Sequence, residues 1–303
     1  MVYHNPVLLQ ECIDGLNIKP EGIYVDTTFG GGGHSRLIMS KLSHGRLFAF
    51  DQDRDAANND LKQAGFKLIN ANFRYLSNFL RMEGVEKIDG LLADLGVSSY
   101  QFDIPERGFS TRFTGKLDMR MNRDADLSAI EVINNYSEES LASILFRYGD
   151  LNNSRRISRE IVRARSISPI RTTTQLIAVI NEIVHEKHRN QFLARVFQAI
   201  RIEVNDEISA LQEMLLSAID MLNPDGRLVV LSYHSLEDRL VKNLMKKGNF
   251  DGLVKKDFFG NQIKKLKEIN KKVIIASKKE VKDNSRARSA KLRVAEKINE
   301  NKN

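Results

Sequence analysis

The chain has 303 residues, a net charge of +8, 42% hydrophobic residues and a single cysteine, Cys12. This length predicts about two domains, and the hydrophobic content suffices for globular cores. One thiol can form neither an internal disulfide nor a multi-cysteine zinc site, which favours a reducing compartment. Residues 1–10 lack a signal-peptide pattern, and no apolar run approaches the roughly 20 residues of a membrane span. We therefore expect a cytoplasmic protein with no membrane partner.

The positive charge is concentrated in two segments. From Lys255 to Asn303 there are 16 Lys and Arg residues against 6 Asp and Glu, so the first 254 residues carry a net charge of −2. Between Arg147 and Arg171 there are seven arginines against two acidic residues. Local positive charge of this kind indicates a polyanionic partner, although a solvated basic surface has the same composition.

The N-terminal third of the chain alternates short apolar runs with helical patterns. This alternation predicts an α/β fold with a parallel sheet and right-handed crossovers. The predicted strands cover 23–26, 47–51, 67–71 and 88–95, and the predicted helices cover 35–42 and 56–64.

The alternation stops between Pro105 and Asn205, where only helical patterns are found. The sheet pattern resumes after a turn at 223–226, and Ser235 with Asp238 has the spacing of a capping box. We therefore predict a discontinuous sheet domain over 1–104 and 206–303, with a helical insertion over 105–205. The helices expected from 105 onward cover 138–148, 154–166, a segment that begins with the capping-box pair Thr172 and Gln175, 190–204 and 207–222; the later strands cover 227–232, 273–277 and 291–295.

A glycine-rich segment follows the first predicted strand, Asp26-Thr27-Thr28-Phe29-Gly30-Gly31-Gly32-Gly33-His34-Ser35. Glycines between a strand and a helix let the backbone turn tightly and approach a ligand. Asp51 ends the second strand, 18 residues after Gly33, which suits an acid that binds ribose hydroxyls. No Gly-x-x-x-x-Gly-Lys-Ser/Thr motif occurs, so a nucleoside triphosphate is disfavoured. Ser35 stands where a dinucleotide fingerprint has glycine or alanine, and Asp26 would suit a cationic ligand. Both favour S-adenosylmethionine, with a nicotinamide cofactor as the alternative.

The fourth predicted strand ends in Asp94-Leu95-Gly96-Val97-Ser98-Ser99. In open α/β sheets, ligands bind beyond the carboxyl ends of the strands. Asp94 is therefore a candidate for the reacting site, and a strand-terminal Asp that only caps a turn is the alternative.

Further motifs accompany residues 28–35 and residues 94–99 with Gln101. They are Asn5-Pro6-Val7-Leu8-Leu9, Glu106-Arg107-Gly108-Phe109-Ser110, Leu117-Asp118-Met119-Arg120-Met121, residues 232–239 and residues 286–293. Taken together, the motifs resemble the RsmH (MraW) family of ribosomal RNA small-subunit methyltransferases over nearly the whole chain. Thr27 stands where this family leads us to expect glycine, and Tyr100 and Ser285 where it leads us to expect proline. Tyr100 leaves the loop around Gln101 less defined, since proline would have fixed its backbone.

The resemblance implies a Rossmann-like class I methyltransferase sheet with an inserted all-helical domain. It implies S-adenosyl-L-methionine as the cofactor and N4-methylation of a cytidine in the decoding region of 16S ribosomal RNA. The implied cofactor-binding residues are Gly32, Gly33 and His34 in the loop, Asp51 at the ribose, Phe73 by the adenine, and Asp94 and Gln101, which complete the site.

The sequence leaves the proton acceptor open. Methyl transfer from an activated sulfonium depends mainly on alignment of donor and acceptor. Asp94, Ser98 or a nearby backbone carbonyl could accept hydrogen bonds from the amine, and His234, after the fifth sheet strand, is the candidate base if one exists. The alternative for His234 is a histidine that only orients its loop. No metal site is predicted, because His185 and His188 have helical spacing but no further ligand pair.

The expected partner is 16S ribosomal RNA or the small ribosomal subunit, held by the arginines of the helical insertion. A stacked target base would have to be extruded. Three alternatives remain: a nicotinamide-dependent oxidoreductase, a non-catalytic RNA-binding ribosome-assembly factor with the same fold, and a DNA amino-methyltransferase. DNA is not expected, because the Asp/Ser-Pro-Pro-Tyr/Phe signature of that last class is absent after Asp94.

Overall fold

The computed structural model describes residues 6–299, so Asn5 of the N-terminal motif lies outside the described residues. The chain divides into two compact units. One comprises the described residues up to Gly96 and from Ser209 onward, and the other is Val97–Ile208. The segment 105–205, expected as a helical insertion, lies inside the second unit. Among the described residues, no helix is long and apolar enough to cross a membrane.

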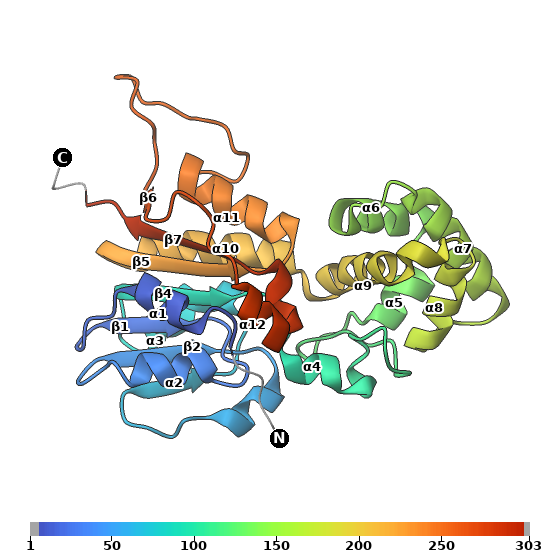
Figure 1. Ribbon diagram of the computed structural model, residues 1–303, viewed down its shortest axis with the longest axis horizontal. Helices are drawn as coiled ribbons and strands as arrows, with labels where there is room; N and C mark the ends of the chain where they lie inside the picture. The colour runs from blue at the N-terminus through green and yellow to red at the C-terminus, as the bar shows by residue number, and fades with distance from the viewer. Residues whose placement is uncertain (1–5, 300–303) are drawn as a thin grey trace. The chain divides into compact units, whose positions relative to one another are not determined.

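The first unit is built around a seven-stranded sheet with the order β3-β2-β1-β4-β5-β7-β6 (Figure 1). Strands β1 to β5 are parallel to one another, as predicted, whereas β7 is antiparallel to both β5 and β6. The strands are β1 (Ile23–Asp26), β2 (Arg46–Phe50), β3 (Phe66–Ile69), β4 (Ile88–Asp94), β5 (Leu222–Ser232), β6 (Leu266–Glu268) and β7 (Lys291–Lys297).

Helices cover both faces of this sheet. Neighbouring residues of β4 show the two layers: Leu91 packs into the core cluster under α3, α10 and α11, and Leu92 into the cluster under α1 and α2. Because such strands are buried on both faces, their sequences are continuous apolar runs. The helices of this unit are α1 (Leu9–Leu16), α2 (Gly33–Met39), α3 (Leu76–Met82), α10 (Glu207–Met221, which starts in the second unit), α11 (Ser235–Lys247) and α12 (Lys278–Asp283), with the short 3₁₀ helices η1 (Arg54–Asn59), η2 (Phe73–Tyr75) and η5 (Ser285–Ser289).

The second unit consists of helices and loops around its own apolar core. On α7, Ile157 and Ile161 are buried, whereas Arg155, Arg156 and Arg159 are exposed. The predicted capping box of Thr172 and Gln175 is confirmed at the start of α8. The elements are α4 (Ser99–Asp103), η3 (Pro105–Arg107), α5 (Ala129–Asn135), α6 (Glu138–Gly149), α7 (Ser154–Ile167), α8 (Thr173–Asn181), η4 (Glu186–His188) and α9 (Arg189–Asn205).

Two predicted elements are wrong. In place of a helix over 56–64 there is only η1, whose N-cap Asp53 accepts a hydrogen bond from the backbone N–H of Asp55. The predicted strand over 273–277 makes a single bridge, between Ile274 and Leu292, and the edge strand is β6 instead.

Two further predicted features, a turn and a capping box, are placed differently in the structure. The predicted turn at 223–226 lies inside β5, where the register with β4 shifts and these residues bulge opposite Asp89. The side-chain amide of Asn223 donates to the Asp89 carboxylate at 3.2 Å, which holds the bulge. The capping box of α11 is formed by His234 and Glu237, one residue earlier than the predicted pair Ser235 and Asp238.

Candidate active site

Three carboxylates lie where three neighbouring parallel strands end. Asp26 is the last residue of β1, Asp94 is the last residue of β4, and Asp51 follows β2 directly. Because β2, β1 and β4 are adjacent and parallel, their carboxyl ends share one edge of the sheet. This edge is where open α/β sheets bind ligands.

Asp26 holds the glycine-rich loop in place. Its side chain is 1% exposed and accepts hydrogen bonds from the Thr28 backbone N–H at 3.0 Å and the Ser35 hydroxyl at 2.6 Å. The Thr28 hydroxyl in turn accepts the backbone N–H of Asp94 at 2.7 Å. The carboxylate of Asp26 therefore organises the loop and connects it to β4.

Thr27, at the position where glycine was expected, is accommodated by the backbone of β4. Both its N–H and its hydroxyl donate to the Leu92 carbonyl, at 2.9 and 3.1 Å, and the residue is 2% exposed. This departure from the family pattern leaves the loop intact.

Gly32 and Gly33 are required by the packing of the chain itself. Gly32 has φ of +73°, which L side chains rarely adopt, and an added Cβ would lie 2.9 Å from the Phe29 ring. A Cβ on Gly33 would lie 2.2 Å from Cγ of Pro6. The two glycines thus fix the backbone at the start of α2 independently of any ligand.

Asp51 presents a carboxylate that is only partly satisfied by the chain. Oδ2 accepts the Gly30 N–H at 2.8 Å, and Oδ1 accepts the Asp53 N–H at 2.9 Å. Burial raises the pKa of Asp51 to about 6, although these two N–H groups act in the opposite direction. Each oxygen has further acceptor capacity, as a group that binds hydroxyls requires.

The segment that carries Phe73 is joined by a hydrogen bond to the segment that carries Asp51. The side-chain amide of Asn72 donates to Gln52 Oε1 at 2.9 Å, which joins the start of η2 to the segment after β2. Phe73 is the first residue of η2 and packs partly buried against the core of the sheet.

Asp94 is contacted by two side chains, one from the start of α2 and one from the loop between β5 and α11. The Tyr233 hydroxyl donates to Oδ1 at 2.7 Å, and His34 Nδ1 lies 3.8 Å from Oδ2. Burial raises the pKa of Asp94, while His34 and the Tyr233 hydrogen bond oppose this rise. Burial and the Asp94 charge likewise raise the pKa of Tyr233 well above its ordinary value. The phenol therefore stays protonated and holds the carboxylate in one orientation.

Tyr233 was missed by the sequence analysis. Tyr233 follows β5 directly, and β5 lies beside β4 in the sheet. Its position after that strand was the sequence feature that could have placed it near Asp94. Sequence alone did not establish that neighbourhood.

The ring of His234 is engaged in the N-cap of its own helix. Nδ1 accepts the Glu237 N–H at 3.4 Å, and Nε2 faces Glu237 Oε1 at 3.0 Å, which is an ion pair when the ring is protonated. Glu237 also accepts the Tyr233 N–H at 2.9 Å. The pair thus orders the loop that carries Tyr233.

Ser98 and Gln101 belong to the second unit, where they bind each other. The Gln101 N–H donates to Ser98 Oγ at 3.3 Å, and the Ser98 N–H donates to Gln101 Oε1 at 3.1 Å, which forms the capping box of α4. The structure thus groups the loop residues, Asp51, Phe73 and Asp94 in the first unit. The binding and catalytic roles expected for all of these residues, and for Ser98, Gln101 and His234, stay predictions.

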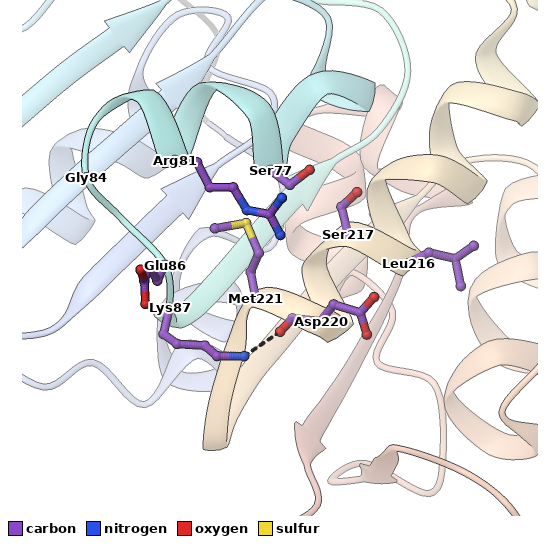
Figure 2. A pocket seen from close by; sticks show the side chains of 9 residues that line it. All are labelled: Ser77, Arg81, Gly84, Glu86, Lys87, Leu216, Ser217, Asp220 and Met221. Carbon is purple, nitrogen blue, oxygen red and sulfur yellow. Dashed lines mark hydrogen bonds between the residues drawn. The ribbon is translucent and has the colours of Figure 1, made fainter.

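An open depression of about 680 Å³ lies between α3 and α10, away from these carboxylates. Lys87 precedes β4 and Met221 precedes β5, so the depression is at the amino ends of the strands. Figure 2 shows the Lys87 ammonium donating to the Asp220 carbonyl, at 2.8 Å. None of the three carboxylates lines it, and we assign it no part in the reaction. Its lining residues are Ser77, Arg81, Gly84, Glu86, Lys87, Leu216, Ser217, Asp220 and Met221.

The sheet has the class I methyltransferase fold. Its strand order is 3-2-1-4-5-7-6, β7 is antiparallel, and acids stand at the ends of the first strands. The chain belongs to the MraW methylase family, whose sequence profile it matches over residues 1–298. It is 55% identical over 297 residues to "Ribosomal RNA small subunit methyltransferase H" of Phocaeicola vulgatus, with 98% of each chain covered. It is 54% identical over 299 residues to the protein of the same name in Flavobacterium johnsoniae, with 98% of this chain and 99% of that one covered.

Proposed function

We propose that this protein transfers a methyl group from S-adenosyl-L-methionine to N4 of a cytidine in 16S ribosomal RNA. The observation that carries the proposal is full-length similarity, above 50% identity, to ribosomal RNA small subunit methyltransferases. The polar groups at the strand ends support it, because they match the chemical demands of the cofactor and of an amine acceptor.

The residues at the strand ends fit S-adenosylmethionine. Asp51 has spare acceptor capacity for ribose hydroxyls. Nε2 of His34 is a buried polar atom without a hydrogen-bond partner in the described part of the chain, and such an atom is costly unless a ligand or water satisfies it. When bound, the cofactor supplies an activated methyl group on a positively charged sulfur.

Asp94 is the residue that we assign to the acceptor amine. The lone pair of a cytosine amine is shared with the ring, and a hydrogen-bond acceptor at its protons makes that pair more available. An ionised Asp94 provides such an acceptor, and Tyr233 fixes its orientation through the 2.7 Å hydrogen bond. Positioning of this kind is the main contribution that a protein makes to such a transfer.

We assign RNA binding to the exposed face of α7. Arg155 and Arg156 are exposed and have no ion-pair partner in the part of the chain that the structure describes. Arg165, in contrast, donates to the backbone carbonyls of Ile133 and Tyr136 and serves the fold. Free guanidinium groups are well suited to phosphates.

The test is transfer of labelled methyl groups from S-adenosylmethionine to small ribosomal subunits that lack the modification. We expect the label in N4-methylated cytidine after nucleoside analysis, and its loss in the Asp94→Ala variant. RNA binding without cofactor binding or transfer would favour the assembly-factor alternative. Label in another nucleoside would refute the proposed acceptor.

A further inference from the structure

Between α11 and β6 the chain forms a long excursion away from the sheet (Figure 1). At its tip, Phe258 is 98% exposed and Phe259 is 85% exposed. We call residues 253–263 the aromatic arm. Two adjacent, almost fully solvated phenylalanines cost hydrophobic free energy, and large exposed apolar groups of this kind mark interaction sites.

The arm is an ordered hairpin. The Asp257 N–H donates to the Asn261 carbonyl, and the Ile263 N–H to the Lys255 carbonyl, both at 2.9 Å. The Asp257 carboxylate accepts the N–H groups of Phe259 and Asn261 at 2.9 and 2.8 Å. The polar groups of the turn are thus satisfied within the arm, and the two rings are left on its outside.

The arm is also attached firmly at its base. The side-chain amide of Gln262 donates to the Lys246 carbonyl at the end of α11, at 2.8 Å. On the other side, the Asn243 amide donates to the Phe250 carbonyl at 2.9 Å, and Phe250 packs against the core of the sheet. A held base lets the tip present its rings without ordering the whole segment on binding.

The rings and the charges of the arm suit one kind of ligand. The Phe258 and Phe259 rings meet edge to face, with centroids 5.7 Å apart and planes at 87°. The two rings are therefore not stacked face to face on each other. Lys255 and Lys256 are exposed, and no ion pair involves them among the described residues. Sites for single-stranded nucleic acids combine two components: aromatic rings on which bases stack, and positive charges that contact the phosphates. The arm has both.

We propose that the aromatic arm binds unpaired nucleotides of the RNA substrate, with bases stacked on Phe258 and Phe259 and phosphates at Lys255 and Lys256. This inference rests on the proposed function in one respect, namely that the substrate is RNA. It adds a second contact surface, on the methyltransferase unit itself, to the arginines of α7. Charge favours RNA over an apolar protein surface, because four lysines and one acid lie between Leu253 and Lys265.

A single introduced tryptophan tests the stacking directly, because the chain has none. In Phe258→Trp, an indole at the tip is the sole tryptophan, and we expect single-stranded RNA from the decoding region to quench its fluorescence. The matched control is Met82→Trp, at a residue of α3 that is 79% exposed. We expect little quenching there at the same RNA concentration. Both substitutions replace solvated side chains, so both variants should fold.

Binding of the same RNA, measured without cofactor, tests the energetics. Phe258→Ala combined with Phe259→Ala should weaken binding about tenfold or more, with the salt dependence unchanged, because no charge is removed. Lys255→Gln combined with Lys256→Gln should also weaken binding and make the slope of log K against log salt shallower by about 0.7 for each phosphate that is no longer neutralised.

Unchanged affinity in the double alanine variant, or equal quenching by RNA in the Phe258→Trp and Met82→Trp variants, would overturn the inference. So would a blue shift of the Phe258→Trp emission on phosphatidylglycerol vesicles with no response to RNA, which would indicate a membrane surface instead. The two proposals are separable. RNA binding through the arm without methyl transfer would refute the proposed function alone, and methyl transfer with an arm that RNA does not touch would refute this inference alone.

Discussion

Replacing Tyr233 with phenylalanine isolates the hydrogen bond that orients Asp94. The substitution removes one hydroxyl, which donates to Oδ1 of Asp94 at 2.7 Å, and keeps the ring. Because this hydrogen bond favours the ionised carboxylate, its loss raises the pKa of Asp94 further in the direction in which burial already moves it.

The size of the effect follows from the strength of a hydrogen bond to a charged group. Such a bond is worth about 1.5–3 kcal/mol, and about 1.36 kcal/mol corresponds to one pH unit. The Asp94 side chain is 23% exposed, so water replaces part of the interaction and the lower end applies. The acid limb of kcat/KM for methyl transfer should therefore move up by about one pH unit in Tyr233→Phe.

The assay is methyl transfer to small ribosomal subunits across a pH series, with wild type and variant side by side and with S-adenosylmethionine saturating at every pH, so that the titration of Asp51 does not set the limb. The rate of the variant should recover above the new limb, since Asp94 is ionised there and only its orientation is less well held. An acid limb at the same pH in both proteins would refute the role of an ionised Asp94. A rate loss of equal size at every pH would indicate that Tyr233 acts only through the shape of the loop.

Three other changes test the remaining assignments. The pKa of Asp51 is raised from 3.8 to about 6, so its ionised form is lost as the pH falls through about 6. Affinity for S-adenosylmethionine, measured by calorimetry, should fall over the same range, and Asp51→Asn should weaken binding and abolish this pH dependence. Gly33→Ala places a Cβ 2.2 Å from Pro6 and should destabilise the protein by about 1–3 kcal/mol; an unchanged thermal midpoint would contradict the packing argument. Arg155→Glu combined with Arg156→Glu should weaken RNA binding with a shallower salt dependence and leave cofactor affinity unchanged, whereas unchanged RNA affinity at matched salt would remove α7 from the interface.

The strands of the sheet were predictable because burial on both faces imposes continuous apolar runs. β1, β2 and β4 each consist of such a run followed by or ending in an acid, and the predicted and observed ends of each agree closely. β6 could not be found in this way, because Lys267 and Glu268 make this edge strand polar. The helix expected over 56–64 failed for a local reason. Asn58, Asn59 and Asp60 compete for backbone hydrogen bonds, and Lys62 adopts φ of +49°.

The acids at the ends of the strands could be predicted from the sequence, but the side-chain contacts around them could not. A parallel sheet places strand-terminal acids at one edge, so Asp51 and Asp94 could be named from the sequence pattern. The contact between Tyr233 and Asp94 depends on β5 lying beside β4, on the rotamers of both residues and on the cap formed by His234 and Glu237. That cap was expected one residue later, a difference that hydrophobic periodicity does not resolve.

The three acids look equivalent in the sequence, and the donors around each one distinguish them. Asp26 accepts hydrogen bonds from the loop that it organises, and at 1% exposure it has no access for a ligand. Asp51 accepts two backbone N–H groups and keeps acceptor capacity, which suits neutral hydroxyl donors. Asp94 is contacted by the phenol of the loop after β5 and by an imidazole from the start of α2, so its orientation depends on side chains rather than on the backbone. A carboxylate held in that way can be perturbed without unfolding the loop, and for this reason Asp94, rather than Asp26, is the one whose neighbours should control the reaction.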